Sequence, residues 1–546
     1  MGAWYDEAII YQIYPKSFQD SNGDGVGDLR GIQARIPYLQ ALGINCVWLN
    51  PVFASPQVDN GYDVANYYAI DERLGTMADM EALIKALHQA KIRVVLDFVV
   101  NHTSDQHPWF QDAIQTPHSL YRDYYIFQNG PAPNNWGSFF GGSVWEEAPD
   151  ASGQMYFHLF DKHMPDLNWA NPEVRHAMQD VAEFWLHKGL DGLRVDAFIH
   201  IAKANLAQDF PTTAADEPVV AEPFFANLPQ VQTWLKPFVA QLKADFPDAF
   251  LLGEAASASV DLASAYTDHL MDAVVSFRYF TQQPGDVGLP AAYQPKMMDW
   301  QAFKQTQAVW QQTLMAYPTL YWSNHDMGRV LGRVAQSATH ARSLAMLMYL
   351  QRGLPIIYYG EELGMQNLQF TSADDFKDPT VAPFVAAAVN HGLSEAEALA
   401  MVSATHKLPA RAPMQWDDAP HHGFSTQTPW LSGQELPTAS AAAQQLDRDS
   451  MWQFYRQLIE LKKRHLFQTG DYLLLTTDEN SYVYQRQTPD AKAIVAVGLG
   501  QQPAQVTLPK GRYSPLLWAG DYQLNGAALT LAPEAGVVLI EERSSL

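Results

Sequence analysis

Eight short runs of apolar and β-branched residues recur along the chain up to residue 359, and longer helical patterns separate most of them. In order, the runs are Ala8–Tyr14, Asn45–Asn50, Ile92–Val100, Gly192–Asp196, Ala249–Glu254, Ala273–Phe277, Thr319–Trp322 and Pro355–Tyr359. Near-continuous apolar strands that alternate with helices indicate a parallel sheet covered by helices. Eight such units predict an α/β fold, namely a (β/α)₈ TIM barrel.

Two segments interrupt this alternation. Residues 102–169 follow the third strand, are rich in Pro, Gly, Trp and Tyr, and are too long for a loop, so they predict an inserted subdomain. Residues 366–431 form a second excursion after the eighth strand. We therefore expect the barrel to be built from residues 1–101 and 170–465.

Near residue 466 the alternation of strands and helices gives way to a pattern of strands alone. Short strands separated by turns follow, at Leu473–Thr477, Tyr482–Gln485, Ala493–Val497, Gln505–Leu508 and Gly536–Ile540. This pattern predicts a C-terminal antiparallel β-sandwich over residues 466–546.

Charge and composition narrow the functional classes. The 546 residues include 35 Lys and Arg against 59 Asp and Glu, which gives a net charge of −24. Such a charge disfavours nucleic acid and anionic membranes as partners. No apolar stretch reaches the roughly 18 residues of a membrane helix, and the N-terminal residues lack a signal-peptide pattern, so we expect a soluble cytoplasmic protein. The single cysteine, Cys46, lies in an apolar run and is expected to be a buried, inert thiol.

Polar residues stand at the ends of several predicted strands. Asp97 and His102 mark the end of the third strand, Arg194 and Asp196 the fourth, and Glu254 the fifth. The seventh strand leads into Asn324-His325-Asp326. One buried carboxylate could belong to a structural ion pair, but groups converging from four strands indicate an active site, because functional residues of a barrel gather at the carboxyl ends of its strands.

The residue types at these strand ends favour glycosidic bond cleavage. The sequence has no Gly-rich phosphate loop after a strand, no Cys/His metal cluster and no Ser nucleophile elbow. Paired carboxylates suit a reaction in which one group attacks or stabilises an oxocarbenium-like centre and the other donates a proton. Arg194 faces the same way as Asp196 and is expected to keep it ionised. Glu254 has no basic neighbour in sequence, which favours the acid role. This chemistry requires no cofactor.

These motifs resemble those of a known family. Asp97–His102, Gly192–Asp196, Gly253–Glu254 and Asn324–Asp326 occur in the order typical of the α-amylase superfamily, glycoside hydrolase family 13. Met164–Asn168 resembles the fifth signature of the family. Asp59–Asp63 and Arg411–Trp416 resemble signatures of its α-glucosidase group, and the chain is most similar to the oligo-1,6-glucosidase and α-glucosidase group. The resemblance extends over about residues 5–540.

The resemblance implies a role for each catalytic carboxylate. Asp196 would be the nucleophile that forms a covalent glucosyl intermediate, and Glu254 would be the general acid and then the base. Asp326 would stabilise the distorted sugar in the transition state. Two inversions retain the anomeric configuration and require carboxyl groups only about 5–5.5 Å apart.

It also implies a closed glucose pocket. His102 and His325 would hydrogen-bond sugar hydroxyls, and Arg194 would orient the nucleophile. Tyr62 would provide a stacking platform, and Asp59 would pair with Arg411 behind the non-reducing end. A closed pocket implies exo-action on short oligosaccharides, which are the expected partners. The protein is expected to be a monomer or homodimer. The histidines near Arg411, which are His406, His421 and His422, are expected on a loop surface.

An Asp/Gly-rich loop near the N-terminus requires separate treatment. It begins like an EF-hand, but the twelfth position is Gly31 rather than Glu, so it is not one. A simple turn is the alternative. In relatives, the same loop resembles a structural Ca²⁺ or Mg²⁺ site. This resemblance implies as ligands Asp20, Asn22, Asp24, Asp28 and the carbonyl of Val26.

Linkage preference is predicted from the residue after the nucleophile. In the group that the chain resembles, Val there accompanies α-1,6 preference and Ala or Thr accompanies α-1,4 preference. Ala197 therefore favours a maltose-type α-glucosidase. An oligo-1,6-glucosidase or dextran glucosidase is the alternative, and transglucosylation or a phosphorylated disaccharide stays open. A catalytically inactive binding barrel is a remote alternative, because all three carboxylates are present.

Overall fold

The predicted barrel strands form one eight-stranded sheet. The computed structural model describes residues 3–116, 118–150, 152–212, 218–283, 285, 289, 292–475 and 478–542. The strand order is β11-β10-β9-β5-β2-β1-β13-β12. The strands are β1 (Ile10–Ile13), β2 (Cys46–Leu49), β5 (Arg93–Val99), β9 (Gly192–Asp196), β10 (Phe250–Glu254), β11 (Ala273–Val275), β12 (Thr319–Leu320) and β13 (Leu354–Tyr358). The pairs β1–β13, β5–β9, β9–β10, β10–β11 and β12–β13 are parallel. All eight predicted strands are confirmed, in the order of a (β/α)₈ barrel.

The chain divides into two compact units. The first unit comprises Met1–Val47, Ala90–Ile92 and Tyr279–Leu546, and the second comprises Trp48–Gln89 and Arg93–Arg278. The division passes through β2, so it cuts the barrel sheet instead of following the domain boundaries expected from sequence, which stay a prediction.

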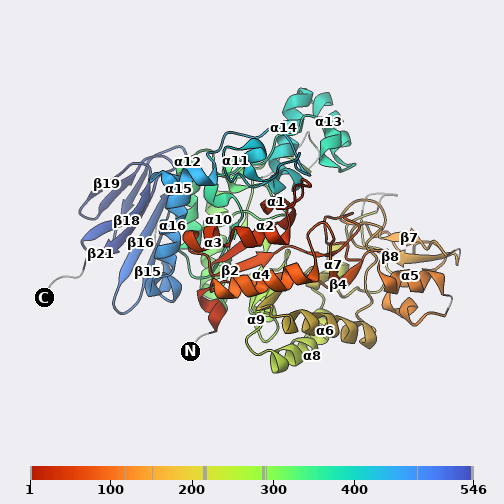
Figure 1. The fold of residues 1–546 in the computed structure, drawn as a ribbon. Coiled ribbons are helices and arrows are strands. Elements are labelled where there is room, and N and C mark those ends of the chain that lie inside the picture. Colours follow the sequence, from red (N-terminus) through yellow and green to blue (C-terminus); the bar gives the residue numbers. More distant parts are fainter. Residues whose placement is uncertain are drawn as a thin grey trace. The chain divides into compact units, whose positions relative to one another are not determined.

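In the second unit, amphipathic helices cover the strands. These helices are α4 (Met77–Gln89), α6 (Pro172–His187), α8 (Pro229–Asp245) and α9 (Val260–Thr267), and α6 packs against α8 (Figure 1). Helix α6 begins where the Asn171 side chain accepts the N–H of Glu173 and Pro172 takes the first helical position. Its buried residues Val174, Met178 and Val181 recur at helical spacing, so one face packs inward.

The inserted subdomain has its own sheet and core. It contains α5 (Pro108–Gln115) and the antiparallel strands β6 (Phe127–Asn129), β7 (Trp145–Glu147) and β8 (Gln154–Phe157), in the order β6-β8-β7. The core is built from Trp136, Val144, Trp145, Phe157, Leu159, Ala221 and Phe225. The prediction of an inserted subdomain is confirmed, and Ala221 and Phe225 join its core from beyond β9.

The first unit contains the helices that follow the remaining barrel strands. They are α2 (Leu29–Ala34), α3 (Ile36–Leu42), α10 (Trp300–Thr313), α12 (Ala338–Tyr349) and α16 (Met451–Lys462). The excursion after β13 folds into α13 (Val381–Asn390) and α14 (Glu395–Thr405), which pack against each other.

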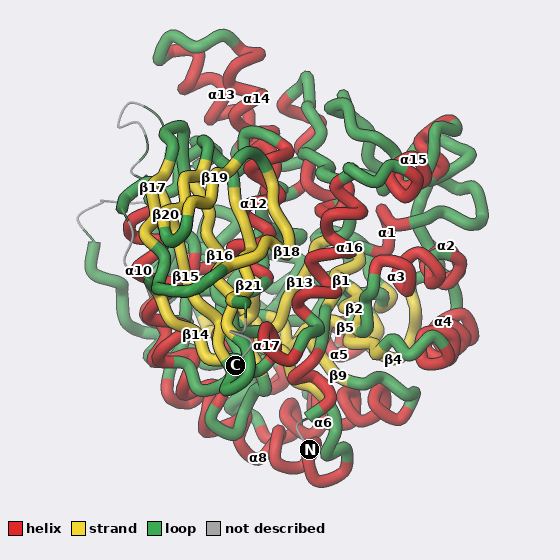
Figure 2. Tube along the Cα trace, turned by 90° about the vertical axis from the view of Figure 1, so that its left-hand side faces the viewer, coloured by secondary structure: helices red, strands yellow, loops and turns green. Residues whose placement is uncertain are grey.

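Two antiparallel sheets form the C-terminal part, as predicted (Figure 2). One contains β14 (Asp471–Leu474), β15 (Ser481–Gln487), β16 (Lys492–Gly498), β21 (Gly536–Glu541) and β18 (Tyr513–Ala519), and the other contains β17 (Ala504–Thr507), β20 (Ala528–Leu531) and β19 (Tyr522–Asn525). One apolar core draws on both sheets, including Ile494, Leu529 and Leu539. Thr476 and Thr477, expected at the end of the first strand, lie outside the described residues.

Two smaller expectations concern membrane helices and the cysteine. Within the described ranges, no helix is both long and apolar enough to cross a bilayer. The thiol of Cys46 on β2 is fully buried, as predicted.

Candidate active site

In the second unit, Arg194 gathers three carboxylates at the ends of neighbouring strands. Its Nη1 contacts Asp97 Oδ1 at 2.7 Å and also Asp196 Oδ1, and its Nη2 lies 3.0 Å from Glu254 Oε2. The Arg194 side chain is 2 % exposed, so the charges interact in a nearly water-free environment. Glu254 therefore does have a basic partner, which the sequence did not indicate because the contact joins two strands.

Asp97 holds this cluster in place. Its Oδ2 accepts hydrogen bonds from the Tyr62 hydroxyl at 2.9 Å, Asn50 Nδ2 at 3.1 Å and Trp48 Nε1 at 3.2 Å. With Arg194 on Oδ1, four donors surround a carboxylate that is fully buried. Asp97 thus fixes the guanidinium that contacts both Asp196 and Glu254, and it ties Tyr62 to the same cluster.

Burial dominates the electrostatics of these carboxyl groups. Burial raises the pKa of Asp196 well above its ordinary value; Arg194 opposes the rise, and the charges of Glu254 and Asp97 add to it. Burial likewise raises the pKa of Asp97 to about 6 against the pull of Arg194. The contact between Arg194 and Asp196 is the expected one, but burial and the neighbouring carboxylates outweigh it, so the pKa of Asp196 lies above its ordinary value instead of being held down as expected.

The residue after the nucleophile candidate has an unusual backbone. Ala197 adopts a left-handed conformation with φ of 48°, and its N–H donates to Glu254 Oε2 at 3.1 Å. A small side chain tolerates this conformation better than a β-branched one. The turn directs the chain away from the strand end and gives Glu254 a second donor.

His102 lies near this cluster on a second polar network. Its Nε2 is buried without a hydrogen-bond partner among the described residues, and burial lowers its pKa to about 4, so the ring is neutral at pH 7. The backbone of Asp166 pairs with that of His102 in an isolated antiparallel β-bridge, and the Asp166 carboxylate contacts Lys203 Nζ at 2.6 Å. Lys203 Nζ also donates to Asn101 Oδ1 at 3.1 Å. A neutral imidazole with a free nitrogen suits a sugar hydroxyl.

In the first unit, His325, Asp326 and Arg411 form a separate cluster. His325 Nε2 lies 3.1 Å from Asp326 Oδ2, and Arg411 Nη2 lies 3.4 Å from Asp326 Oδ1. Arg411 Nε also donates to the carbonyl of His325 at 2.9 Å. Gln12 Nε2, from β1, lies 2.8 Å from His325 Nδ1. Three residues that sequence reasoning assigned to one site are thus brought together, and Gln12 is an additional partner.

Asp59 and Tyr62 lie on a loop organised by Asp63. The fully buried Asp63 carboxylate accepts N–H groups from Val58 at 2.8 Å and from Asp59 at 3.1 Å. The proposed pairing of Asp59 with Arg411 joins residues of the two units and stays a prediction.

The Asp/Gly loop is held together by its own acidic side chains. Asp20 Oδ2 accepts the Gly25 N–H at 2.8 Å and the Ser425 hydroxyl at 2.6 Å, and these contacts lower its pKa despite partial burial. Asn22 and Asp24 are exposed. The donor set is all oxygen, which fits Ca²⁺ or Mg²⁺. However, no group of three His, Cys, Asp or Glu side chains within the described ranges is close enough to hold a metal, so the ligand set Asp20, Asn22, Asp24, Val26 and Asp28 stays a prediction.

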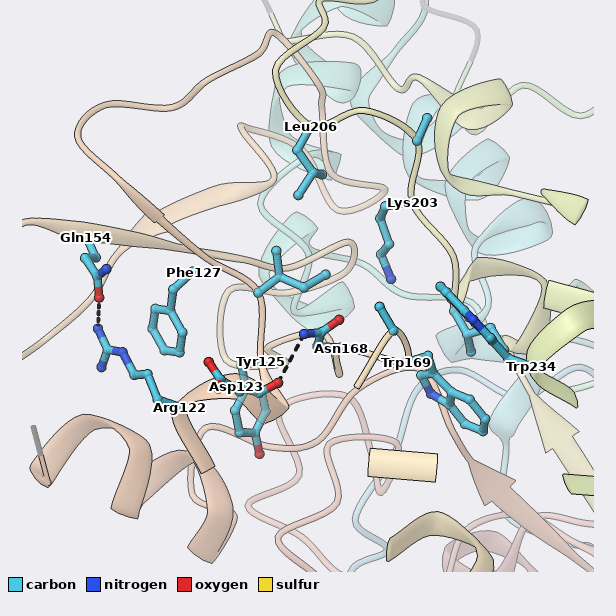
Figure 3. Close-up of a pocket in the computed structure, with 14 residues that line it drawn as sticks. Arg122, Asp123, Tyr125, Phe127, Gln154, Asn168, Trp169, Lys203, Leu206 and Trp234 are labelled. Carbon is cyan, nitrogen blue, oxygen red and sulfur yellow. Dashed lines mark hydrogen bonds between the residues drawn. The ribbon is translucent and has the colours of Figure 1, made fainter. Parts of the chain in front are cut away.

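A cavity of about 450 Å³ lies beside the inserted subdomain (Figure 3). Its lining includes Arg122, Asp123, Phe127, Asn168, Trp169, Lys203 and Trp234. Asn168 Nδ2 donates to the Asp123 carbonyl at 3.1 Å on one wall. Lys203 connects this cavity to Asp166 and hence to the His102 network.

Comparisons with known proteins define the class. The profile of the α-amylase catalytic domain matches residues 12–470. The chain belongs to the α-amylase family, glycoside hydrolase family 13.

Individual relatives place the chain more narrowly. A solved structure described as a family GH13_31 enzyme is 61 % identical, has a TM-score of 0.93 and covers 99 % of this chain and 100 % of that one. The oligo-1,6-glucosidase of Parageobacillus thermoglucosidasius is 36 % identical over 519 residues, covering 93 % of this chain and 92 % of that protein. The trehalose-6-phosphate hydrolase of Bacillus subtilis is 36 % identical over 523 residues, with coverages of 93 % and 91 %.

Proposed function

We propose that the protein is a retaining, exo-acting α-glucosidase that releases glucose from the non-reducing end of short α-glucosides. The observation that carries this proposal is that one buried guanidinium contacts both Asp196 and Glu254. Two carboxyl groups that share a guanidinium lie close together, as the double displacement of a retaining glycosidase requires.

The proposed reaction has two steps. In the first, Asp196 attacks the anomeric carbon while Glu254 donates its proton to the leaving oxygen, which gives a covalent glucosyl ester and a free aglycone. In the second, Glu254 takes a proton from water, whose oxygen displaces Asp196 and releases glucose with its α configuration retained. A sugar hydroxyl in place of water gives transglucosylation.

The other site residues would bind the same glucosyl unit. We assign the stabilisation of the transition-state charge to Asp326, and hydrogen bonds to sugar hydroxyls to His102 and His325. A neutral His102 with an unpartnered buried Nε2 supports this role, because an unsatisfied buried polar atom costs free energy until a ligand pairs with it.

For the linkage, we propose that α-1,6 bonds are favoured. The curated relative from P. thermoglucosidasius carries the name oligo-1,6-glucosidase and matches nearly the full chain. Ala197 alone favours α-1,4 bonds, so the two lines of reasoning predict opposite preferences. Full-length similarity draws on the whole pocket and outweighs a single position. Cytoplasmic location, the bound metal and the monomeric or homodimeric state stay predictions.

The test is the kcat/KM of the purified protein on isomaltose, maltose and trehalose 6-phosphate side by side. Faster isomaltose turnover is expected. Faster maltose turnover would support the α-1,4 preference that Ala197 indicates. If trehalose 6-phosphate were the only good substrate of the three, neither the α-1,6 nor the α-1,4 assignment would hold. Proton NMR of the first-formed glucose should show the α anomer, and the Asp196→Asn variant should fold but lose nearly all hydrolysis.

A further inference from the structure

His406 is buried, which corrects the expectation of a loop-surface residue. Its side chain is 7 % exposed, and its ring packs against Phe376 and Tyr293, with centroid distances of 5.4 and 5.6 Å. His421, by contrast, is exposed. His406 stands between α14 and the 3₁₀ turn Leu408–Arg411, which ends in the pocket residue Arg411.

Two hydrogen bonds define the protonation of the His406 ring. Nδ1 accepts the backbone N–H of Leu408 at 3.0 Å, and Nε2 lies 3.2 Å from Asp378 Oδ2. A backbone N–H can only donate, so Nδ1 must be the unprotonated nitrogen. Nε2 therefore carries the proton and donates it to Asp378. Burial lowers the pKa of His406, in keeping with a neutral ring of this tautomer.

Asp378 is itself held from several directions. Its Oδ1 accepts the N–H and the hydroxyl of Thr380 at 2.8 and 2.7 Å, and its Oδ2 accepts the Tyr293 hydroxyl at 2.9 Å. The His406 hydrogen bond lowers the pKa of Asp378 far below its ordinary value, so the carboxylate is ionised at pH 7. Asp378 is a fixed acceptor at the start of the α13–α14 excursion.

The contacts continue from His406 to the candidate substrate site. His406 binds the N–H of Leu408, where the 3₁₀ turn begins, and the turn ends three residues later at Arg411. The Arg411 guanidinium then contacts Asp326 Oδ1 and the carbonyl of His325. A shift of the turn would displace the guanidinium relative to Asp326.

We propose that His406 and Asp378 are a positioning pair that sets the Arg411 guanidinium against Asp326 and so controls binding of the terminal sugar. This inference rests on the proposed α-glucosidase function and on the place behind the non-reducing end that the family resemblance implies for Arg411. It assigns to the excursion after β13 a role in substrate recognition rather than in packing alone.

Three substitutions of His406 separate its two hydrogen bonds. In His406→Asn the amide oxygen stands near the place of Nδ1 and keeps the Leu408 N–H bond, whereas in His406→Gln the amide nitrogen reaches toward Asp378. His406→Ala loses both bonds. We expect about a 10-fold rise in KM for isomaltose in His406→Ala, and about a 3-fold rise when one bond remains. The kcat should change less than KM, and His421→Ala is the matched control without effect.

Coupling to Arg411 provides the decisive measurement. If His406 acts through Arg411, the His406→Ala substitution should cost little kcat/KM in an Arg411→Ala background, so the double-mutant cycle is non-additive. Additive costs would overturn the proposal, because they would mean that His406 contributes only to general packing.

A second readout does not depend on activity. Hydrogen–deuterium exchange of the peptide spanning residues 406–414 should be faster in His406→Ala than in the wild type, with His421→Ala unchanged. Unchanged exchange would also overturn the proposal. Failure of the wild type to hydrolyse any α-glucoside would refute the proposed function instead, and the exchange experiment would still decide whether His406 positions the Arg411 turn.

Discussion

Replacing Asp97 by Asn removes one charge from the centre of the candidate site while preserving its volume. An Asn has one carbonyl oxygen, and Asp97 accepts bonds from Arg194 on one oxygen and from Trp48, Asn50 and Tyr62 on the other. If the amide oxygen keeps the three donors, the amide nitrogen faces the Arg194 guanidinium as a second donor. A buried ion pair is therefore broken whichever way the amide turns.

Two effects of opposite sign are expected. Losing one partner of a buried ion pair costs about 3–5 kcal/mol, so the urea midpoint of unfolding should fall markedly. The Asp97 carboxylate, however, is one of the charges that raise the pKa of Asp196. Its removal lowers that pKa, so the nucleophile stays ionised to more acidic pH. The acid limb of the kcat/KM profile should shift to lower pH although kcat itself falls.

The assay is a pH series of kcat/KM together with urea unfolding followed by Trp fluorescence. Asp191→Asn is the control, because Asp191 contacts the half-exposed Arg93 at 2.6 Å just before β9, at the strand end remote from Asp196. That variant should lose stability without moving the acid limb. An acid limb that moves to higher pH in Asp97→Asn, or unchanged stability, would refute the electrostatic reasoning.

Three further predictions follow from other parts of the fold. Burial raises the pKa of Glu361 from 4.5 to about 7, so ionising this carboxyl lowers the stability of the folded protein as pH rises from about 4.5 to 7. Between pH 5 and pH 8, the free energy of unfolding of Glu361→Gln should therefore rise by about 3 kcal/mol relative to the wild type, measured by thermal unfolding. If the Asp/Gly loop binds a divalent ion, EDTA should lower the Tm of the wild type but not of Asp24→Ala, and equal responses would contradict a metal site. Lys203→Met leaves the buried Asp166 carboxylate without its cation and should cost about 3–5 kcal/mol in urea unfolding, which Asp166→Asn in the same background should partly restore.

The barrel was predictable because each of its strands is a short, almost wholly apolar run. The strands of the C-terminal part that were missed from sequence, β18, β19 and β20, are different. β19 has only half-buried and exposed positions, β20 has two buried positions, and each strand is four residues long, which leaves little room for a pattern. The core of the inserted subdomain includes Phe225 from beyond β9, and no local pattern in the sequence indicates such a distant contact.

The charged residues of the candidate site were predictable from their places within or at the end of apolar strands, whereas two uncharged polar residues in similar places were missed. Asp196 and Glu254 stand at strand ends, where a barrel sequence indicates functional residues. Gln12 and Asn50 are also polar residues within or at the end of apolar runs, so the same rule applied to β1 and β2 would have found the partners of His325 and Asp97. The sharing of Arg194 among three carboxylates depends on the register of neighbouring strands, which sequence does not specify.

The burial of Cys46 has a practical consequence. It is the sole sulfhydryl of the 546-residue chain, and its side chain is fully enclosed within the barrel sheet. A maleimide dye added to the native protein has no exposed native cysteine to modify. One cysteine introduced at a chosen surface position therefore becomes a unique attachment point, without prior removal of a native one. Pairs of such labels, one on the α13–α14 excursion and one on the inserted subdomain, would report by energy transfer whether the distance between these segments changes when sugar is added.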